Sequence, residues 1–423
     1  MIYNLKYTKF SQYQKVLLEK EGEIVISKDG FQLKGKGASD IGETISFADI
    51  KEWKSKEGLV TFSTVSKERY MLSNFRNLFN DFLRDFVKAR NEFLMKALFM
   101  TDGEFVAEYE ADFEIFSKYE KSLSRGHGKI HLYDRSVVIV PDVRDAFSIS
   151  LNFLKRVDID EEFYEIHLTL DQGFVIHFKK LGSIFEEFNA KLQEIQQKMY
   201  QKTVDDFKDI FLEFDSATLI KIAYEMKRGK AVNTKKLKKI DEKLLEETKK
   251  TVLHDELSQK HFDYFSKMAD SDSIHFGINP DPPKHQAQGQ DLTYSTWFFM
   301  GIPDKNLVVA EITSGGYRGA YFFKIIMEQG DPAEKIEEKL LEINQALLKL
   351  KFVTTSFYKD KRELRRSVYR FALRKLPYLR LLRRSYVGRL TPFNEIDWDK
   401  RINDIFKKAD LSNNSSNNRG RRN

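Results

Sequence analysis

The first half of the chain consists of short runs in which apolar and polar residues alternate, followed by longer runs with helical spacing. Ile24 and Ile26 alternate with their neighbours, and Ile166 and Leu168 do the same further along. A period of two is typical of a strand with one face on a core. The helical runs predict helices that cover their own sheets. Their apolar faces consist of Leu78, Phe79, Phe82 and Phe86, then Phe185, Phe188, Leu192 and Ile195.

The same order of predicted elements occurs twice, at a shift of about 105 residues. Asp29-Gly30 lies between two alternating runs of the first copy and predicts a hairpin turn. Two copies of one structural unit are the economical explanation. The first copy comprises residues 21–35, 43–53, 58–64 and 67–74 and a helix over 75–94, and the second comprises 128–140, 147–157, 163–170 and 171–179 and a helix over 184–199.

The segments Ile45–Trp53 and Ile149–Val157 carry the same apolar spacing in the two copies. With the runs around them, they resemble the pleckstrin-homology-like superfold, including its GRAM and bacterial families, over roughly residues 15–200. The resemblance implies two bent antiparallel sheets or barrels, each closed by a C-terminal helix. It also implies binding of phosphoinositides or peptides rather than catalysis.

Lipid-binding members of that superfold carry a basic cluster between their first two strands. Here the corresponding loops are Lys28-Asp29-Gly30 and Tyr133–Ser136, and each holds one cation and one carboxylate. The resemblance therefore gives weaker support to phosphoinositide binding than to a protein partner.

The chain changes character after the repeats and predicts an α+β protein of several parts. A charged helical region follows the second copy, and a proline-rich segment precedes further strands and helices. The expected parts are pleckstrin-homology-like modules over 1–100 and 101–203, a helical connector over 204–270, a flexible loop over 271–291, a C-terminal α+β module with basic helices over 292–409, and a disordered tail over 410–423. Whether the C-terminal module is a third copy stays open.

Positive charge is concentrated in Lys359–Arg389, which holds 12 basic and two acidic residues, a net charge of +10, while the whole chain carries +7. On a helix, its apolar residues from Leu364 to Tyr386 form one stripe and several arginines lie on the other side. Pro377 should kink or divide this amphipathic helix. The candidate polyanion-binding residues are Arg362, Arg365, Arg366, Arg370, Arg374, Lys375, Arg380, Arg383 and Arg384.

Three uses of this basic stretch remain open. Its apolar stripe can dock on its own domain while the arginine heads stay in water. Its cations can contact a phosphate-rich partner, either an anionic membrane surface or nucleic acid, and the tyrosines among them suit base stacking. It can also bind a protein. The chain has no cysteine and no long apolar run, so we expect a cytoplasmic protein with no transmembrane segment. Peripheral association with a membrane and the oligomeric state stay open.

No residue pattern predicts catalysis, a cofactor or a metal. His127 and His131 are separated along an expected strand, and His254 and His261 are expected on a solvated helix face. Phosphate-loop, serine hydrolase and kinase signatures are missing. We therefore expect a non-catalytic binding or scaffolding protein, with a nucleic-acid-associated protein and an enzyme of an unrecognised class as alternatives.

Overall fold

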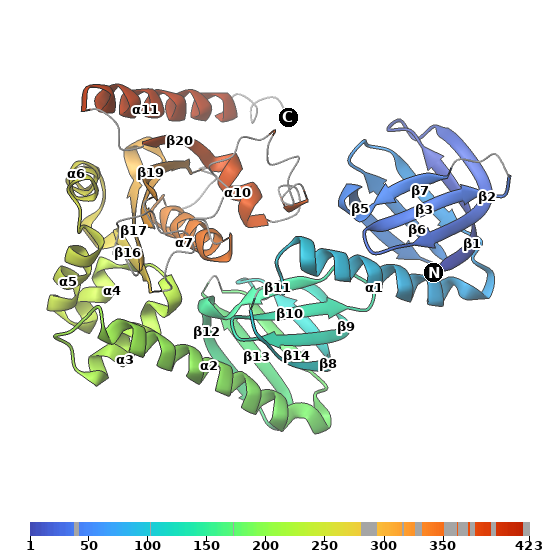
Figure 1. Ribbon diagram of the computed structural model, residues 1–423, viewed down its shortest axis with the longest axis horizontal. Coiled ribbons are helices and arrows are strands. Elements are labelled where there is room, and N and C mark those ends of the chain that lie inside the picture. Colours follow the sequence, from blue (N-terminus) through green and yellow to red (C-terminus); the bar gives the residue numbers. More distant parts are fainter. Residues whose placement is uncertain are drawn as a thin grey trace. The chain divides into compact units, whose positions relative to one another are not determined.

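Antiparallel sheets and helices make up the chain, which confirms the expected α+β class (Figure 1). The chain divides into one unit of Met1–Gln193 with Arg362–Leu376, and a second of Glu194–Lys361 with Pro377–Asn423. The computed structural model describes residues 1–37, 42–101, 103–171, 173–280, 294–314, 317–325, 332–350, 362, 371–372, 377–390 and 395–417. Among these residues, no helix is both long enough and apolar enough to cross a membrane.

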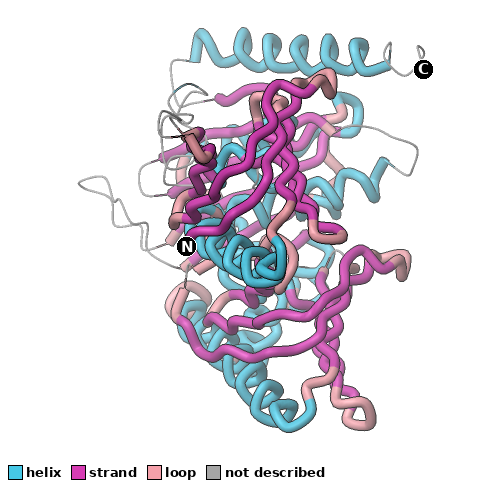
Figure 2. The backbone as a smooth tube through the Cα atoms, turned by 90° about the vertical axis from the view of Figure 1, so that its right-hand side faces the viewer, coloured by secondary structure: helices cyan, strands magenta, loops and turns pink. Residues whose placement is uncertain are grey.

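The first unit contains two seven-stranded sheets whose strands follow the same order and curl strongly (Figure 2). The first sheet, in the order β4-β3-β2-β1-β7-β6-β5, consists of β1 (Ile2–Phe10), β2 (Val16–Ile26), β3 (Gly30–Gly35), β4 (Glu43–Ser46), β5 (Ile50–Lys56), β6 (Leu59–Thr64) and β7 (Arg69–Ser73). The second, in the order β11-β10-β9-β8-β14-β13-β12, consists of β8 (Phe105–Phe116), β9 (Ser122–Tyr133), β10 (Ser136–Pro141), β11 (Phe147–Ser150), β12 (Leu154–Asp160), β13 (Glu165–Leu170) and β14 (Val175–Lys179).

The elements of the two sheets correspond one to one. Strands β3 and β10 begin at Gly30 and Ser136, 106 residues apart, whereas β4 and β11 begin at Glu43 and Phe147, 104 residues apart. The spacing returns to 106 residues at β6 and β13. The first copy thus has a longer connection before its fourth strand, and the second has a longer hairpin after its fifth.

Each sheet buries the inward face of its strands under the helix that follows it. Helix α1 (Phe79–Ala97) covers the first core, and Phe82 and Phe86, four residues apart on one face, are both 0% exposed. Helix α2 (Phe185–Lys208) begins over the second core with Phe188, also 0% exposed. Six of the eight apolar residues expected on these two faces are buried, whereas Leu78 is 41% exposed and Phe79 is half-buried. The boundary between the two units falls within α2.

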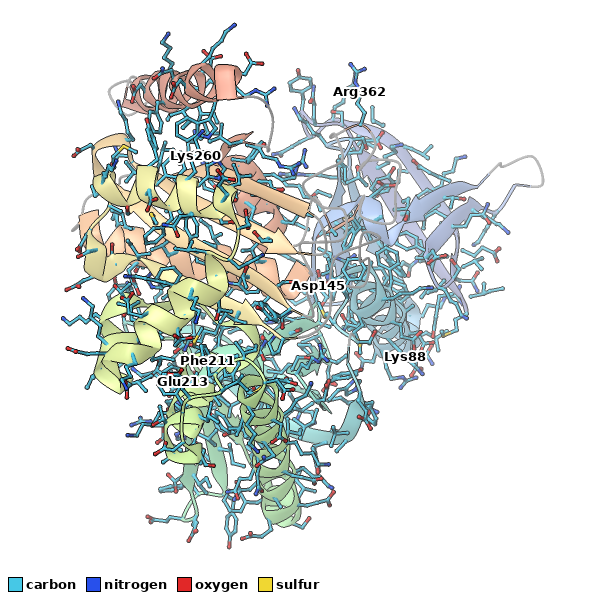
Figure 3. All side chains as sticks on the ribbon, turned by 60° about the vertical axis from the view of Figure 1, so that its left-hand side comes forward. Lys88, Asp145, Phe211, Glu213, Lys260 and Arg362 are labelled. Atoms are coloured by element: carbon cyan, nitrogen blue, oxygen red, sulfur yellow. The ribbon has the colours of Figure 1, made fainter. Side chains whose placement is uncertain are left out.

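Helix α1 also binds the loop between β10 and β11 of the second sheet. The Arg90 guanidinium is buried and donates to Asp145 through Nε at 2.6 Å and Nη2 at 2.8 Å, and Trp53 Nε1 donates to the same carboxylate at 2.7 Å. Beside it, the Asn91 side chain donates to the carbonyls of Pro141 and Arg144 and accepts from a backbone amide. Figure 3 labels Asp145 at this contact. The two copies therefore meet through a bidentate ion pair supported by backbone hydrogen bonds.

The second unit is built on one six-stranded antiparallel sheet in the order β15-β16-β17-β18-β19-β20. Its strands are β15 (Val232–Asn233), β16 (His275–Asn279), β17 (Ser295–Ile302), β18 (Leu307–Ser314), β19 (Tyr317–Lys324) and β20 (Tyr386–Leu390). Both faces are buried, since Phe298 and Phe322 belong to one apolar cluster and Phe299 and Phe323 to another. Because its order and coverage differ from those of the first two sheets, this unit is not a third copy of the repeat.

Helices cover the two faces of this sheet. One face packs against the end of α2 and against α3 (Ser216–Glu225), α4 (Thr234–Ile240), α5 (Glu242–Val252), α6 (Glu256–Phe265) and α11 (Glu395–Asn417). The other packs against α7 (Pro332–Leu350) and α10 (Pro377–Ser385). Asp215, Asn233, Asp241 and Asp255 each accept a backbone hydrogen bond at the start of α3 to α6, so the charged region is a series of short capped helices. These helices belong to the core of this unit and do not form a separate connector.

Three local expectations differ from the secondary structure of the described residues. Strand β16 lies inside the expected loop over 271–291. Its Gly277 allows the indole of Trp297 to approach closely, since a Cβ at this position would lie 2.0 Å from Trp297 Nε1. Residues 386–390 form β20 rather than helix, because they pair with the exposed edge of β19. Residues 410–417, expected to be disordered, continue α11, since adding a residue to a formed helix is far easier than starting one. The remainder of the expected loop from 281 and of the tail from 418 lies outside the described residues.

Candidate functional site

The hairpin tips joining β1 to β2 and β8 to β9 carry the same short sequence. Phe10–Leu17 reads FSQYQKVL and Phe116–Leu123 reads FSKYEKSL, so five of eight positions are identical. The surrounding strands match much less: of the twelve positions in Ile24–Gly35, only Ile24 is identical to its counterpart 106 residues on. The apolar spacing alone does not reveal either tip, although the repeated eight residues are a signal in the sequence.

The two tips also have the same backbone geometry. The amide of Ser11 donates to the Lys15 carbonyl at 2.8 Å, and its hydroxyl accepts from the amides of Tyr13 and Lys15 at 3.2 Å each. Ser117 repeats the backbone bond at 2.9 Å and the hydroxyl bonds at 3.3 and 3.2 Å. Both hairpins shift register one residue before the shared phenylalanine. The serine therefore has a structural role in each turn.

The tyrosine takes part in each turn through its backbone amide, but its side chain makes none of these turn hydrogen bonds. Tyr13 is 83% exposed and Tyr119 is 79% exposed. The leucines four residues further on, Leu17 and Leu123, are also exposed. Single exposed apolar residues are ordinary on protein surfaces. An exposed aromatic, a lysine and a leucine at the same three places of two equivalent hairpins are a repeated surface feature, which defines the tip surfaces as candidate binding sites.

The basic stretch is described in part. Among the predicted cations, Arg362 in the first unit and Arg380 and Arg384 in the second are exposed, and Arg383 is half-buried (Figure 3 labels Arg362). Pro377 is the first residue of α10, as its missing amide favours. Arg365, Arg366, Arg370, Arg374 and Lys375 lie outside the described residues.

Helix α10 has the expected division into two faces. Leu379 and Leu382 are 0% exposed, and Leu382 belongs to the cluster between the sheet and α7. Arg380 and Arg384 lie on the exposed side of the same helix. The helix therefore docks on its own unit through its apolar face and leaves arginines in solvent. Binding of a polyanion by these arginines stays a prediction.

The histidines singled out by spacing occupy two kinds of place. His127 Nδ1 lies 2.9 Å from an Asp112 oxygen, and His131 Nε2 lies 3.0 Å from an oxygen of Glu108. These two histidines face different carboxylates, so they do not form a common site.

His261 was expected on a solvated helix face, and this is wrong because it is 0% exposed. Its Nδ1 lies 2.9 Å from Glu311 Oε2, and its Nε2 accepts from Trp398 Nε1 at 3.1 Å. Lys260, labelled in Figure 3, lies over the indole of Trp398 at 5.2 Å. Both ring nitrogens are thus engaged in holding α11 against α6 and β18.

A third group of histidines was missed by sequence reasoning. Glu165, His167 and His177 come together on β13 and β14, each half-buried, with one potential ligand atom from each within 4.8 Å of the others. The signal that could have found them is the Asp-Gln-Gly sequence between two alternating runs, since a hairpin predicted there pairs position 167 with 177.

Comparisons with known proteins give little further information. No family model matches the chain, and a search of curated proteins finds no match. Among solved structures, one match is the "Structure of the Spt16D Pob3N heterodimer", with a TM-score of 0.15 and 12% sequence identity over 41% of this chain and 85% of that chain. At that TM-score the likeness carries no argument about fold or function.

Proposed function

We propose that this chain is a non-catalytic binding or scaffolding protein whose two pleckstrin-homology-like modules each use the same hairpin tip to contact a protein partner. The retained Tyr13 and Tyr119 carry the proposal, because their rings are exposed and contribute nothing to either core. The shared strand order and the closing helices support the pleckstrin-homology-like assignment.

Tyrosine is well suited to such a contact. Its ring offers a large apolar area with few rotatable bonds, and its hydroxyl can donate or accept a hydrogen bond. Two copies of one tip on a single chain allow two weak contacts to reinforce each other, and linked contacts of this kind raise affinity by about 10²–10⁴-fold when both can engage.

Site-specific photo-crosslinking tests this proposal. Benzoylphenylalanine is placed at Tyr13 or Tyr119 of the full chain, and at Phe163 as a control, since Phe163 is 64% exposed on a different hairpin. We expect both tip positions to crosslink to the same partner protein, and the control position not to crosslink to it. Adducts that are absent at both tips, or identical at all three positions, would contradict the proposal.

Substitution of the tips provides the second measurement. We expect Tyr13→Ser and Tyr119→Ser each to weaken retention of the crosslinked partner, because one contact remains, and the double variant to abolish it, because both contacts are lost. Equal retention by the double variant and the parent would show that the tips are not the binding surface.

A separate observation supports contact between α10 and an anionic surface. Arg380 and Arg384 are exposed on a helix whose apolar face is already buried. We propose that the exposed arginine face of α10 strengthens binding to phosphate-rich surfaces. The test is co-sedimentation of the chain and its Arg380→Gln/Arg384→Gln variant with phosphatidylcholine vesicles, with and without phosphatidylserine, at two salt concentrations. We expect the parent to bind only the anionic vesicles, more weakly at high salt, and the variant to bind less.

A single-stranded oligonucleotide is the comparison in that experiment. Binding to the oligonucleotide and not to either vesicle would favour the nucleic-acid alternative. Equal sedimentation of the parent and the variant in every arm would remove α10 from the functional account.

A further inference from the structure

The outer face of the second sheet carries two histidines on neighbouring strands. Ile166 and Leu168 of β13 are buried, as are Ile176 and Phe178 of β14. Successive side chains of a strand point to opposite faces, so the residues between them, together with Glu165, lie on the face turned away from the core. His167 and His177 are directly opposite each other in the antiparallel register of these two strands.

These side chains are close enough to share a ligand. The two imidazole rings are stacked, with centroids 3.7 Å apart and planes at 15°, and Glu165 Oε2 lies 3.1 Å from His167 Nε2. The Phe116 ring packs on His177 with centroids 4.7 Å apart. All three donor groups are half-buried, which limits competition from bulk water.

We propose that Glu165, His167 and His177 bind a divalent transition-metal ion of the zinc type. Two imidazoles and one carboxylate form a three-ligand set that zinc accepts, with water in the fourth position. A tetrahedral ion with bonds of about 2.0–2.1 Å needs donor atoms about 3.4 Å apart. The donor atoms already lie within 4.8 Å of one another, so each pair has to close by at most about 1.4 Å to bind one ion.

The surroundings favour this chemistry. The registers place Asp158 opposite His167 and Glu114 opposite His177. Glu114 accepts hydrogen bonds from Ser122 and Lys179, and Asp158 pairs with Arg156, so the contribution of these carboxylates is negative charge on the same face of the sheet.

The alternative to a metal site is that the two histidines form an ordinary cross-strand aromatic pair. Such a pair explains the stacking but not the presence of a carboxylate on the same face within reach of both rings. Elsewhere in the same sheet, His127 pairs with Asp112 and lacks a second histidine. Among the described residues, a group of three potential ligands occurs at Glu165, His167 and His177.

Titration of the metal-stripped full chain with Zn²⁺ alone, followed by calorimetry, tests the site. We expect one equivalent to bind, and His167→Gln or His177→Gln to weaken binding by at least about 10-fold, since each removes a ligand. His127→Gln is the matched control, an exposed histidine of the same sheet beside a carboxylate, and should bind as the parent does. Co²⁺ should give the strong visible absorption of tetrahedral coordination in the parent and not in the two ligand variants.

Two results would overturn the proposal. One is the absence of stoichiometric Zn²⁺ binding by the parent, and the other is equal binding by the parent and both ligand variants. Circular dichroism of each metal-free variant checks its fold. If His177→Gln fails to fold, Glu165→Gln provides the decisive measurement, because it keeps both rings and removes only the carboxylate ligand. Parent-like affinity and an unchanged Co²⁺ spectrum in that variant would refute the three-ligand site.

Discussion

Replacement of Asp145 by alanine should destabilise the first unit at the contact between its two copies. The Arg90 side chain is 1% exposed and the Asp145 side chain is 34% exposed. Removing one partner of a fully buried ion pair costs about 3–5 kcal/mol, because the remaining charge is left without compensation. Water can approach from the Asp145 side, so we place the expected loss near the lower limit, at about 3 kcal/mol.

Hydrogen exchange of the full chain measures this loss locally, since a chain with two units need not unfold in a single transition. We expect the backbone amides of the C-terminal half of α1 (Phe79–Ala97) to exchange roughly 100-fold faster in Asp145→Ala than in the parent, because each 1.4 kcal/mol corresponds to a factor of ten. Asp142→Ala is the control, since Asp142 is exposed on the same loop.

The pair itself can be separated from general damage to the loop. In the double variant Arg90→Met/Asp145→Ala, no buried charge remains, so we expect part of the lost protection to return. The reasoning would be refuted if the local stability of α1 fell by less than about 0.5 kcal/mol in Asp145→Ala, or if it fell equally in Asp145→Ala and Asp142→Ala.

Three further predictions concern other places in the chain. Burial and the hydrogen bond to Asp85 raise the pKa of Tyr3 to about 12, above its unfolded value of about 10. The stabilisation from this group is therefore complete below pH 10 and is lost as the pH rises through 12. Between pH 9 and pH 12, the free energy of unfolding measured by denaturation should fall more in the parent than in Tyr3→Phe. Phe371→Ala, at a ring 3% exposed and 5.2 Å from that of Phe93, should cost about 3 kcal/mol, measured by exchange of α1. Gly277→Ala should destabilise the second unit by about 1–3 kcal/mol in thermal unfolding monitored by near-ultraviolet circular dichroism, because a Cβ would lie 2.0 Å from the facing indole nitrogen.

Both closing helices and most strands of the first unit could be predicted because local spacing determines them, but the expected copies begin at residues 21 and 128 and so omit β1 and β8. Alternation gave the strands, and the i, i+4 spacing of Phe82 and Phe86 gave the buried face of α1. The same stripe continues into Arg90, where an apolar residue would be expected. A charged residue in an apolar stripe indicates a buried partner, but no local pattern identifies Asp145, which is 55 residues away in the chain.

The second unit was harder to predict because its sheet is buried on both faces. Strand β17 is buried along its length and apolar from Trp297 onward, so it lacks the alternation that marks a half-buried strand. Tyr386 matched the helical stripe of the basic stretch, but pairing with β19 outweighs that spacing and turns residues 386–390 into a strand. His261 matched a polar helix face, and only the tertiary structure supplies Glu311 as its buried partner.

The two copies of the repeat differ most where packing tolerates change. The second copy has Val137 in place of Phe31, and Leu168 in place of Phe62, yet all four side chains are at most 3% exposed. Cores accept such exchanges when the total volume and the polarity pattern are kept, so identity at these positions is not needed for the fold.

The tips show the opposite behaviour, since the tyrosine is unchanged although its ring packs against neither core. A serine held by the turn and a phenylalanine beside the register shift have structural reasons to recur in both copies. An exposed ring has none, because its replacement by a polar residue should change stability by less than about 0.5 kcal/mol. Identity that exceeds what folding requires is best explained by a contact outside the chain, so we propose that the tips, rather than the sheets, bind the partner.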